Sequence, residues 1–285
     1  MNHTGSVPGD ERVAIVTGAS SGIGEATAIA LGRAGYAVAL AARRRDKLAE
    51  VAARCEAAAG RSGCFPVMPT DVAKQQEVEA LIRQTVDRFG RVDVLVNSAG
   101  FGVTARVHET TDRDMRDIFD ANFFGVFYGC KAVAPVMMRQ RSGHIFNVSS
   151  VIGRRGCPFN GAYSATKFAV CGLTEAMRVE MIPYNVRVTS VCPGLVDTEF
   201  FRHVRGGTTL NRTSYARIRG LMPAEKVARK IVSAVGKNKP ELVFSAAGRL
   251  LVFISARWPR LADRIMKFYH DDLVRAGRAG PPPDH

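Results

Sequence analysis

The sequence predicts an α/β fold with one doubly wound sheet of about seven parallel strands and helices on both faces. Short apolar runs typical of buried strands alternate with helical patterns along most of the chain. A glycine-rich turn directly follows the first apolar run and opens the first helical pattern, as is typical of such sheets. With 285 residues, of which 46% are hydrophobic, the chain is long enough to bury the core of one large domain.

Each predicted strand is a short apolar run. The seven runs are residues 13–18, 37–42, 64–70, 92–97, 143–149, 186–192 and 241–246. Helical patterns at 24–35, 46–60 and 73–90 separate the first four, and each ends at a glycine that suits a helix C-cap. We find no internal repeat or linker, so residues 1–275 are expected to form a single domain and 276–285 a disordered tail.

The formal charge of +14 is concentrated near the C-terminus. Residues 201–285 contain 17 Lys+Arg and 6 Asp+Glu, whereas residues 1–200 contain 23 and 20. No helix-turn-helix, zinc-finger or RNA-binding aromatic pattern accompanies this excess. The sequence therefore favours a solvated basic face over nucleic-acid binding.

The cysteines are scattered and form no CxxC pair, which argues against a metal site and against a disulfide framework. They are Cys55, Cys64, Cys130, Cys157, Cys171 and Cys192. No run approaches the roughly 18 apolar residues that cross a bilayer, and the first residues lack the apolar core of a signal peptide. These patterns predict a soluble, cytoplasmic protein whose cysteines are reduced core thiols.

The turn TGASSGIG lies between the first predicted strand and the first predicted helix. Gly18, Gly22 and Gly24 permit a tight turn there and let backbone N–H groups approach a pyrophosphate at the helix N-terminus. A bare glycine triplet is a weak signal, but the strand before it and the helix after it strengthen the prediction of a dinucleotide site.

The end of the second predicted strand indicates which dinucleotide would bind. An NAD site usually has an Asp or Glu here, whereas this chain has Ala42 followed by Arg43 and Arg44. A guanidinium can pair with a ribose 2′-phosphate, and no carboxylate repels it. The sequence therefore predicts NADP(H) in preference to NAD(H); the alternative is a solvated arginine run before a helix.

Five motifs together resemble the single-domain short-chain dehydrogenase/reductase family. They are TGASSGIG, NSAG at 97–100, Asn122, the serine pair 149–150 and YSATK at 163–167, and they occur in the family's order and spacing over about residues 12–200. The resemblance implies a Rossmann-type sheet, a nicotinamide cofactor, and interconversion of an alcohol with a ketone or aldehyde. It also suggests a homodimer or homotetramer.

The resemblance makes Tyr163 the acid/base, Lys167 its partner, Ser150 the ligand of the substrate oxygen, and Asn122 the holder of a water that links Lys167 to solvent. Elementary chemistry agrees for the first pair, because a cation one helical turn away is expected to lower the pKa of a phenol from about 10. Ser149 is the alternative strand-end hydroxyl. For Asn122 the alternative is a local backbone contact or a helix cap.

The resemblance also implies a set of cofactor-binding residues beyond the glycine turn and the arginines. They are Ser20, Ser21, Ile23, Asp71, Val72, Asn97, Ala99, Gly100, Pro193, Gly194, Val196 and Thr198, together with Tyr163 and Lys167. Ser98 departs from the commoner NNAG form of the strand-end motif, which puts only the local geometry in doubt.

Residues 199–222 are predicted to form a substrate lid because they lack periodicity and contain a Gly-Gly pair at 206–207. Residues 247–275 form a helical extension, broken at Pro259, whose apolar spacing suits packing over the substrate cleft or against a second subunit. Basic residues accompany its aromatics, a combination that would suit contact with a membrane surface. This contact is the less favoured alternative.

The predicted activity is interconversion of a ketone or aldehyde and an alcohol on a lipophilic small molecule. Two other functions stay open. One is reduction of 3-oxoacyl groups on an acyl carrier protein, where a basic face would meet an acidic partner. The other is a non-enzymatic NADPH-binding or redox-sensing protein.

Overall fold

A computed structural model describes residues 11–202, 204–205, 221–244 and 246–278. Its centre is a seven-stranded parallel sheet in the order β3-β2-β1-β4-β5-β6-β9. The strands are β1 (Val13–Thr17), β2 (Ala37–Ala42), β3 (Val67–Pro69), β4 (Val94–Asn97), β5 (Gly143–Val148), β6 (Val186–Cys192) and β9 (Glu241–Val243). All seven predicted strands are confirmed, most with slightly narrower bounds.

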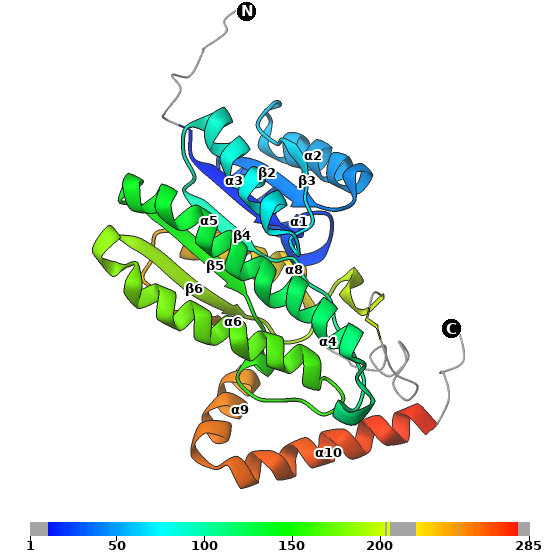
Figure 1. Ribbon diagram of the computed structural model, residues 1–285. Helices are drawn as coiled ribbons and strands as arrows, with labels where there is room; N and C mark the ends of the chain where they lie inside the picture. Colours follow the sequence, from blue (N-terminus) through cyan, green and yellow to red (C-terminus); the bar gives the residue numbers. More distant parts are fainter. Residues whose placement is uncertain (1–10, 203, 206–220, 245, 279–285) are drawn as a thin grey trace, which may run out of the picture.

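Helices cover both faces of this sheet (Figure 1). One face carries α1 (Gly22–Arg33), α2 (Arg45–Ala59) and α8 (Ala224–Ala234), and the other carries α3 (Gln75–Phe89), α5 (Gly125–Gln140) and α6 (Gly161–Glu180). Alternate residues of β1 enter different cores: Val16 packs on the α1 side and Ile15 on the α5 side. Because both faces are covered, the strands are continuous apolar runs.

The three helix-ending glycines have the backbone conformation that the sequence predicts. Gly35, Gly60 and Gly90 have φ of +87°, +66° and +77°, the left-handed region that glycine adopts at little cost. They follow α1, α2 and α3 and turn the chain toward the next strand.

Strand order places the switch in winding direction between β1 and β4. The chain runs outward from β1 to β2 and β3, and then returns to β4 on the other side of β1. In open α/β sheets, ligands bind outside the carboxyl ends of the strands at such a switch point. The glycine turn after β1 and the NSAG segment after β4 lie there.

A small second sheet was not predicted. It pairs β7 (Val196–Asp197) with β8 (Met222–Pro223), so the two ends of the predicted lid are held together. Between them lie a 3₁₀ turn, Glu199–Arg202, and an extended pair of residues in which Arg205 N–H donates to the Gly102 carbonyl at 2.9 Å. The Gly-Gly pair and residues 208–220 of the predicted lid lie outside the described residues.

The segment before α5 begins as α4 (Asp112–Phe119) and passes through a π-helical turn, Asp120–Phe124. Among the described residues, the stretch Asp112–Gln140 is long and apolar enough to span a membrane by length and composition alone. Its α5 part contributes Val126, Val133 and Met137 to the core and packs against α3, so its position is that of a core helix. Three further 3₁₀ turns are Val107–Glu109, Val151–Gly153 and Ile182–Tyr184.

The C-terminal helices α9 (Ala246–Arg257) and α10 (Pro259–Arg278) lie together at one end of the molecule, beyond α6 (Figure 1). Pro259 is the first residue of α10, which agrees with the predicted break. Leu273 packs on Phe159, His270 stacks on the same ring with centroids 5.0 Å apart, and Arg155 forms an ion pair with Asp263. These contacts attach α10 to the loop before α6.

Candidate active site

A cavity of about 850 Å³ opens at the carboxyl ends of the central strands. It reaches from the glycine turn after β1 to the C-terminal helices. Eighteen of the predicted site residues line it, namely Gly18, Ser20, Ser21, Gly22, Ile23, Arg43, Arg44, Asp71, Val72, Ala99, Gly100, Ser150, Tyr163, Lys167, Pro193, Gly194, Val196 and Thr198. The structure thus brings together residues that are up to 180 positions apart in the chain.

Gly24 lies beneath the cavity wall and serves the packing of α1. A Cβ on Gly24 would lie 2.2 Å from the carbonyl oxygen of Gly18, and one on Gly18 would lie 2.8 Å from the Ala99 backbone. Gly18 also has φ of +67°. Both glycines therefore allow close backbone packing between the turn, α1 and the end of β4.

The N-terminus of α1 points its free N–H groups at the cavity. Ser21 is the N-cap residue, and its side chain makes no capping hydrogen bond to the helix. Gly22, with φ of +59°, lies next to Thr198, and a Cβ there would lie 3.0 Å from the threonine methyl group. An uncapped helix N-terminus suits a phosphate group, because its free N–H groups and the positive end of the helix dipole favour an anion.

Two arginines follow β2 at one end of the cavity, beside Ala42. The Arg44 guanidinium donates to Ser20 Oγ at 3.2 Å and lies 3.5 Å from the Glu199 carboxylate. Among the residues that the structure describes, no hydrogen bond or ion pair engages the Arg43 guanidinium. Arg44 is thus positioned by the protein, whereas Arg43 is exposed at the rim.

Asn97 is buried below the cavity and does not line it. Its Nδ2 donates to Asn147 Oδ1 at 2.9 Å, and a Cβ on Gly129 would lie 2.5 Å from its Oδ1. Successive side chains of a strand alternate between faces, so the last residue of β4 points toward α5. Ser98 and Ala99 line the cavity instead.

The two strand-end serines have different surroundings. Ser149 Oγ donates to the Lys167 carbonyl at 2.9 Å and contacts Cys171 Sγ at 3.2 Å, so its hydroxyl is engaged with α6. Among the described residues, Ser150 Oγ makes only long contacts: it donates to the Pro193 carbonyl at 3.3 Å and accepts from Ile152 N–H at 3.4 Å. Ser150 therefore has the more available hydroxyl.

Tyr163 and Lys167 lie one turn apart on α6, and both line the cavity. The Lys167 ammonium donates to the Val148 carbonyl at 2.8 Å and lies 5.5 Å from the centroid of the Tyr163 ring. Burial lowers the pKa of Lys167 to about 8, against the opposing effect of Cys171 and Cys192. The ammonium therefore stays mostly protonated at pH 7.

The predicted lowering of the Tyr163 pKa is wrong for this arrangement of protein atoms. Desolvation raises the pKa of the phenol above its usual value, and Cys192 acts in the same direction. The ammonium does not offset this, because it is directed at a carbonyl oxygen rather than at the phenol. The phenol is consequently held in its protonated form at neutral pH.

Asn122 lies in the π-helical turn between α4 and α5 and is fully buried. Its Oδ1 accepts from Phe101 N–H and its Nδ2 donates to the Phe101 carbonyl, both at 2.9 Å, and Nδ2 also lies 3.3 Å from Thr166 Oγ1. A Cβ on Gly100 would come within 2.7 Å of Oδ1. The side chain therefore fixes the loop after β4 and does not itself line the cavity. π-helical turns are frequent at functional sites, but no pattern in the sequence marks this one.

The far end of the cavity has a largely apolar wall, and part of it comes from the C-terminal helices. Leu251 of α9 and Ile265, Met266 and Tyr269 of α10 line it, as does Phe200, whose ring centroid lies 5.5 Å from that of Tyr163. Sequence reasoning did not name the four helical residues as site residues. The available signal was the near-helical apolar spacing beyond residue 260.

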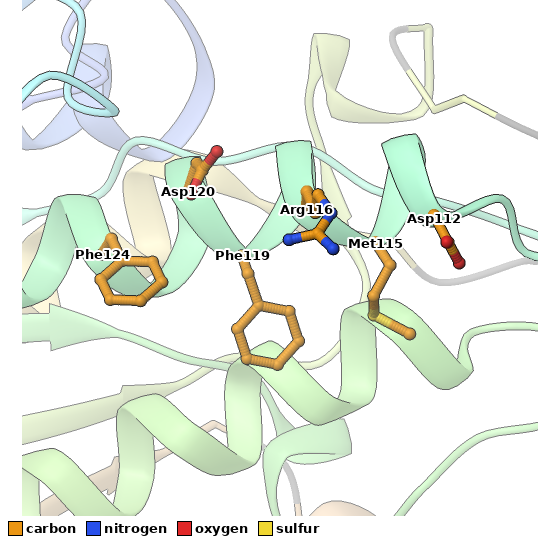
Figure 2. Close-up of a pocket in the computed structure, with 6 residues that line it drawn as sticks. All are labelled: Asp112, Met115, Arg116, Phe119, Asp120 and Phe124. Atoms are coloured by element: carbon orange, nitrogen blue, oxygen red, sulfur yellow. The ribbon is translucent and has the colours of Figure 1, made fainter.

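A smaller hollow of about 420 Å³ follows α4 and the π-helical turn. Figure 2 shows Met115, Phe119 and Phe124 on one side of this helical path, with Asp120 directed to the other. Asp120 also lines the larger cavity, but the hollow itself contains none of the predicted catalytic residues. The larger cavity is therefore the candidate active site.

The sheet, the glycine turn and the Ser150, Tyr163 and Lys167 constellation are those of an α/β oxidoreductase. A family model described as short chain dehydrogenase matches residues 12–208. The chain therefore belongs to the short-chain dehydrogenase/reductase family, and it is an oxidoreductase by that membership.

Similar proteins agree with this assignment. An uncharacterized oxidoreductase of Staphylococcus saprophyticus is 36% identical over 81% of this chain and 92% of its own length. A short-chain dehydrogenase/reductase of Burkholderia phymatum in complex with NAD has a TM-score of 0.80 at 28% identity, over 90% of this chain and 96% of that one. An alcohol dehydrogenase of Thermococcus sibiricus complexed with 5-hydroxy-NADP has a TM-score of 0.72 at 30% identity, over 82% and 96%.

Proposed function

We propose that the protein is an NADP(H)-dependent oxidoreductase that interconverts a ketone or aldehyde and an alcohol on a lipophilic small molecule. One observation carries this proposal. A single cavity joins the glycine turn and the two arginines at one end to Ser150, Tyr163 and an apolar wall at the other. A dinucleotide and an apolar carbonyl compound would thus meet beside the phenol.

The residues along the cavity fit a nicotinamide dinucleotide. The N-terminus of α1 would hold the pyrophosphate, and Asp71 and Val72 would lie beside the adenine, while Pro193, Gly194 and Thr198 would lie near the carboxamide. The bound nicotinamide supplies or accepts the hydride. Arg43 and Arg44 favour a 2′-phosphate, because their guanidinium groups can pair with it. Ala42 stands at the end of β2, where an NAD site usually has a carboxylate, so no negative charge repels the phosphate.

Tyr163 acts as the acid in the direction of reduction. Its raised pKa keeps the phenol protonated at neutral pH, so it can donate a proton to the carbonyl oxygen as negative charge develops there. Ser150 Oγ holds the same oxygen. The Lys167 ammonium, mostly charged below its pKa of about 8, would stabilise the phenolate that remains by turning from the Val148 carbonyl toward it.

Asn122 acts through position rather than by contact with the substrate. Its two hydrogen bonds to Phe101 hold the loop after β4, which carries Ala99 and Gly100 into the cavity. The family resemblance implies a water that links Lys167 to solvent. Because the Asn122 amide is bound to Phe101, this water would be held by a backbone group of the π-helical turn instead.

We place the activity in the cytoplasm, in a homo-oligomer. All six cysteines are free and four of them are buried, which suits a reducing compartment. Size-exclusion chromatography with light scattering would test the oligomer, since a monomeric mass would contradict it.

The first experiment is NADPH oxidation by the purified protein with ketones and aldehydes graded from small and polar to large and lipophilic, with NADH in parallel. Turnover that requires NADPH and rises with substrate lipophilicity is expected. Turnover only with 3-oxoacyl groups on a carrier protein would favour the carrier-protein function. Tight NADPH binding without turnover on any substrate would favour a binding protein.

A further inference from the structure

The C-terminal helices expose an unusual amount of apolar surface. Within the described part of α9, α10 and the residue that joins them, six large apolar side chains are between 39% and 74% exposed. We call them the C-terminal apolar surface: Leu250, Phe253, Trp258, Leu261, Ile265 and Phe268. A surface of this kind on a folded domain usually marks an interaction site.

The two sides of α10 explain why these side chains remain outside. Ala262 and Leu273 face the protein and are nearly fully buried. Leu261, Ile265 and Phe268 follow the i, i+4, i+7 spacing of a second stripe, so they share a different side of the same helix. One apolar side of α10 thus packs against the rest of the protein, and a second apolar side is left exposed by the described residues.

The corner between the helices carries two aromatic rings of this surface. Phe253 and Trp258 meet edge to face with ring centroids 5.9 Å apart, and Trp258 N–H donates to the Ile254 carbonyl at 2.7 Å. The two rings pack against each other, although each is more than half exposed. Exposed aromatic side chains suit a partner that is apolar inside and polar at its boundary.

Basic side chains surround the apolar ones. Arg249, Arg257, Arg260 and Arg264 are exposed, and within the described ranges none of them forms an ion pair. Two of the three carboxylates of α10 are engaged, since Asp263 pairs with Arg155 and Asp271 with Lys267, and the third, Asp272, is exposed. The surface is therefore cationic as well as apolar.

The C-terminal apolar surface continues into the candidate active site. Ile265 belongs to both, because it lines the cavity and is 39% exposed. Met266 and Tyr269, the next inward positions of α10, line the cavity, as does Leu251 beside the exposed Leu250. The C-terminal apolar surface and the apolar wall of the cavity therefore meet at Ile265.

We propose that α9 and α10 dock on the surface of an anionic lipid bilayer and that the lipophilic substrate enters the cavity from it. The substrate route rests on the proposed function; the docking does not. Apolar and aromatic side chains with flanking arginines have the chemistry of helices that lie in a membrane interface.

A second copy of the chain fits this surface less well, because a two-fold contact would set the same arginines against each other. A soluble acidic protein would match the charge but leave the exposed aromatic rings without an apolar partner.

Trp258 offers a direct measurement, because it is the only tryptophan in the chain. Its emission would be recorded as the full-length protein, without cofactor or substrate, is titrated with vesicles of phosphatidylcholine alone or with one third phosphatidylglycerol. A blue shift with the anionic vesicles, weakened by added salt, is the expected result. No shift with either vesicle, or an equal and salt-independent shift with both, would overturn the proposal.

Two pairs of variants separate docking from general surface effects. Phe268→Ser is expected to weaken vesicle co-sedimentation at least fivefold, whereas Ile182→Ser, at an exposed site on another part of the chain, leaves it unchanged. Arg260→Glu is expected to weaken it more than fivefold, and Arg83→Glu on α3 serves as the matched charge control. If each test variant equals its control, the proposal fails. If Phe268→Ser instead lowers the mass of the protein in solution, the surface is a contact between copies.

A last comparison keeps this proposal separate from the proposed function. Tyr163→Phe should bind anionic vesicles as the unmodified protein does, even though its turnover is lost. With a lipophilic ketone dissolved in vesicles, Phe268→Ser should raise the apparent KM, while its KM for a water-soluble ketone stays unchanged. Vesicle binding without any turnover would refute the proposed function and leave the docking intact. An unchanged KM in vesicles would refute the substrate route.

Discussion

The two ends of the candidate active site are built in different ways. The cofactor end is formed by turns that follow β1, β2 and β4 and by the N-terminus of α1, with glycines and small side chains in close contact. The substrate end is closed by apolar side chains of α9 and α10, which lie outside the sheet and its covering helices. Residues 12–208 match the family, and both of these helices lie beyond that range.

This difference separates chemistry from selectivity. A backbone turn held by close packing between strands can tolerate few substitutions, because a Cβ added at Gly18 or Gly24 would meet another backbone atom. Apolar side chains on an appended helix pair can change size without disturbing the sheet. We therefore expect the cofactor end to decide whether the protein turns over and the substrate end to decide what it turns over.

The largest effect is expected from Tyr163→Phe, which removes the proton donor and keeps the ring that packs near Phe200. Turnover should fall by about 10²–10⁴-fold while NADPH still binds. Rates and cofactor fluorescence titrations would measure the two effects, with Tyr184→Phe, outside the cavity, as control. Near-normal turnover would remove Tyr163 from the mechanism.

The next effect concerns cofactor choice. Replacing both Arg43 and Arg44 by alanine should weaken NADPH binding at least tenfold and change NADH binding little, because only NADPH has the 2′-phosphate. Dissociation constants from fluorescence titration would test this. Arg45→Ala, at the exposed start of α2 and outside the cavity, is the matched control. Equal losses for both cofactors would contradict the assigned role.

A smaller effect is expected at the substrate end. Leu251→Ser places a hydroxyl in the apolar wall and should raise KM for a lipophilic ketone by about tenfold in solution, with little change for a small polar ketone. Leu250→Ser is the neighbouring control, because Leu250 is exposed and does not line the cavity. If the two variants behave alike, α9 does not contribute to selectivity.

The smallest effect at neutral pH should come from His144, which lies near the amino end of β5, whereas the site lies at the carboxyl ends of the strands. Gly236 N–H donates to its Nδ1 at 3.2 Å and Nε2 lies 2.8 Å from Thr189 Oγ1, so the neutral ring suits its neighbours. Burial lowers its pKa from 6.5 to about 3. The unfolded state therefore binds the proton first, and stability is lost as pH falls from about 6.5 toward 3.

That loss amounts to about 1.4 kcal/mol per pH unit below the unfolded pKa. Urea unfolding would give the free energy of unfolding at pH 7 and at pH 5 for the unmodified protein and for His144→Gln. Between pH 7 and pH 5 this free energy should fall by about 2 kcal/mol more in the unmodified protein than in the variant. Cofactor affinity at pH 7 should be the same in both proteins. An identical pH dependence would mean that His144 titrates normally in the fold.

Sequence reasoning was most successful where local pattern and tertiary role coincide. Strands buried on both faces are continuous apolar runs, so β1 to β6 and β9 were recognisable, and Gly60 and Gly90 mark the helix ends by their backbone freedom. It failed for the β7–β8 pair, because two residues on each side carry no periodicity. It also missed the π-helical turn at Asn122, since hydrogen-bond register inside a helix leaves no clear mark in a sequence.

The sequence by itself determined the fold class, the order of the strands along the chain, and the residue types that meet at the switch point. Only the tertiary structure decided that Ser149 is engaged with α6 while Ser150 is available, and that Asn97 points below the cavity. It alone decided that desolvation keeps Tyr163 protonated and that α10 has one side in the cavity and another exposed. The reason is physical: periodicity reports which side of an element is apolar, but burial, pKa and hydrogen-bond partners depend on atoms contributed by distant parts of the chain.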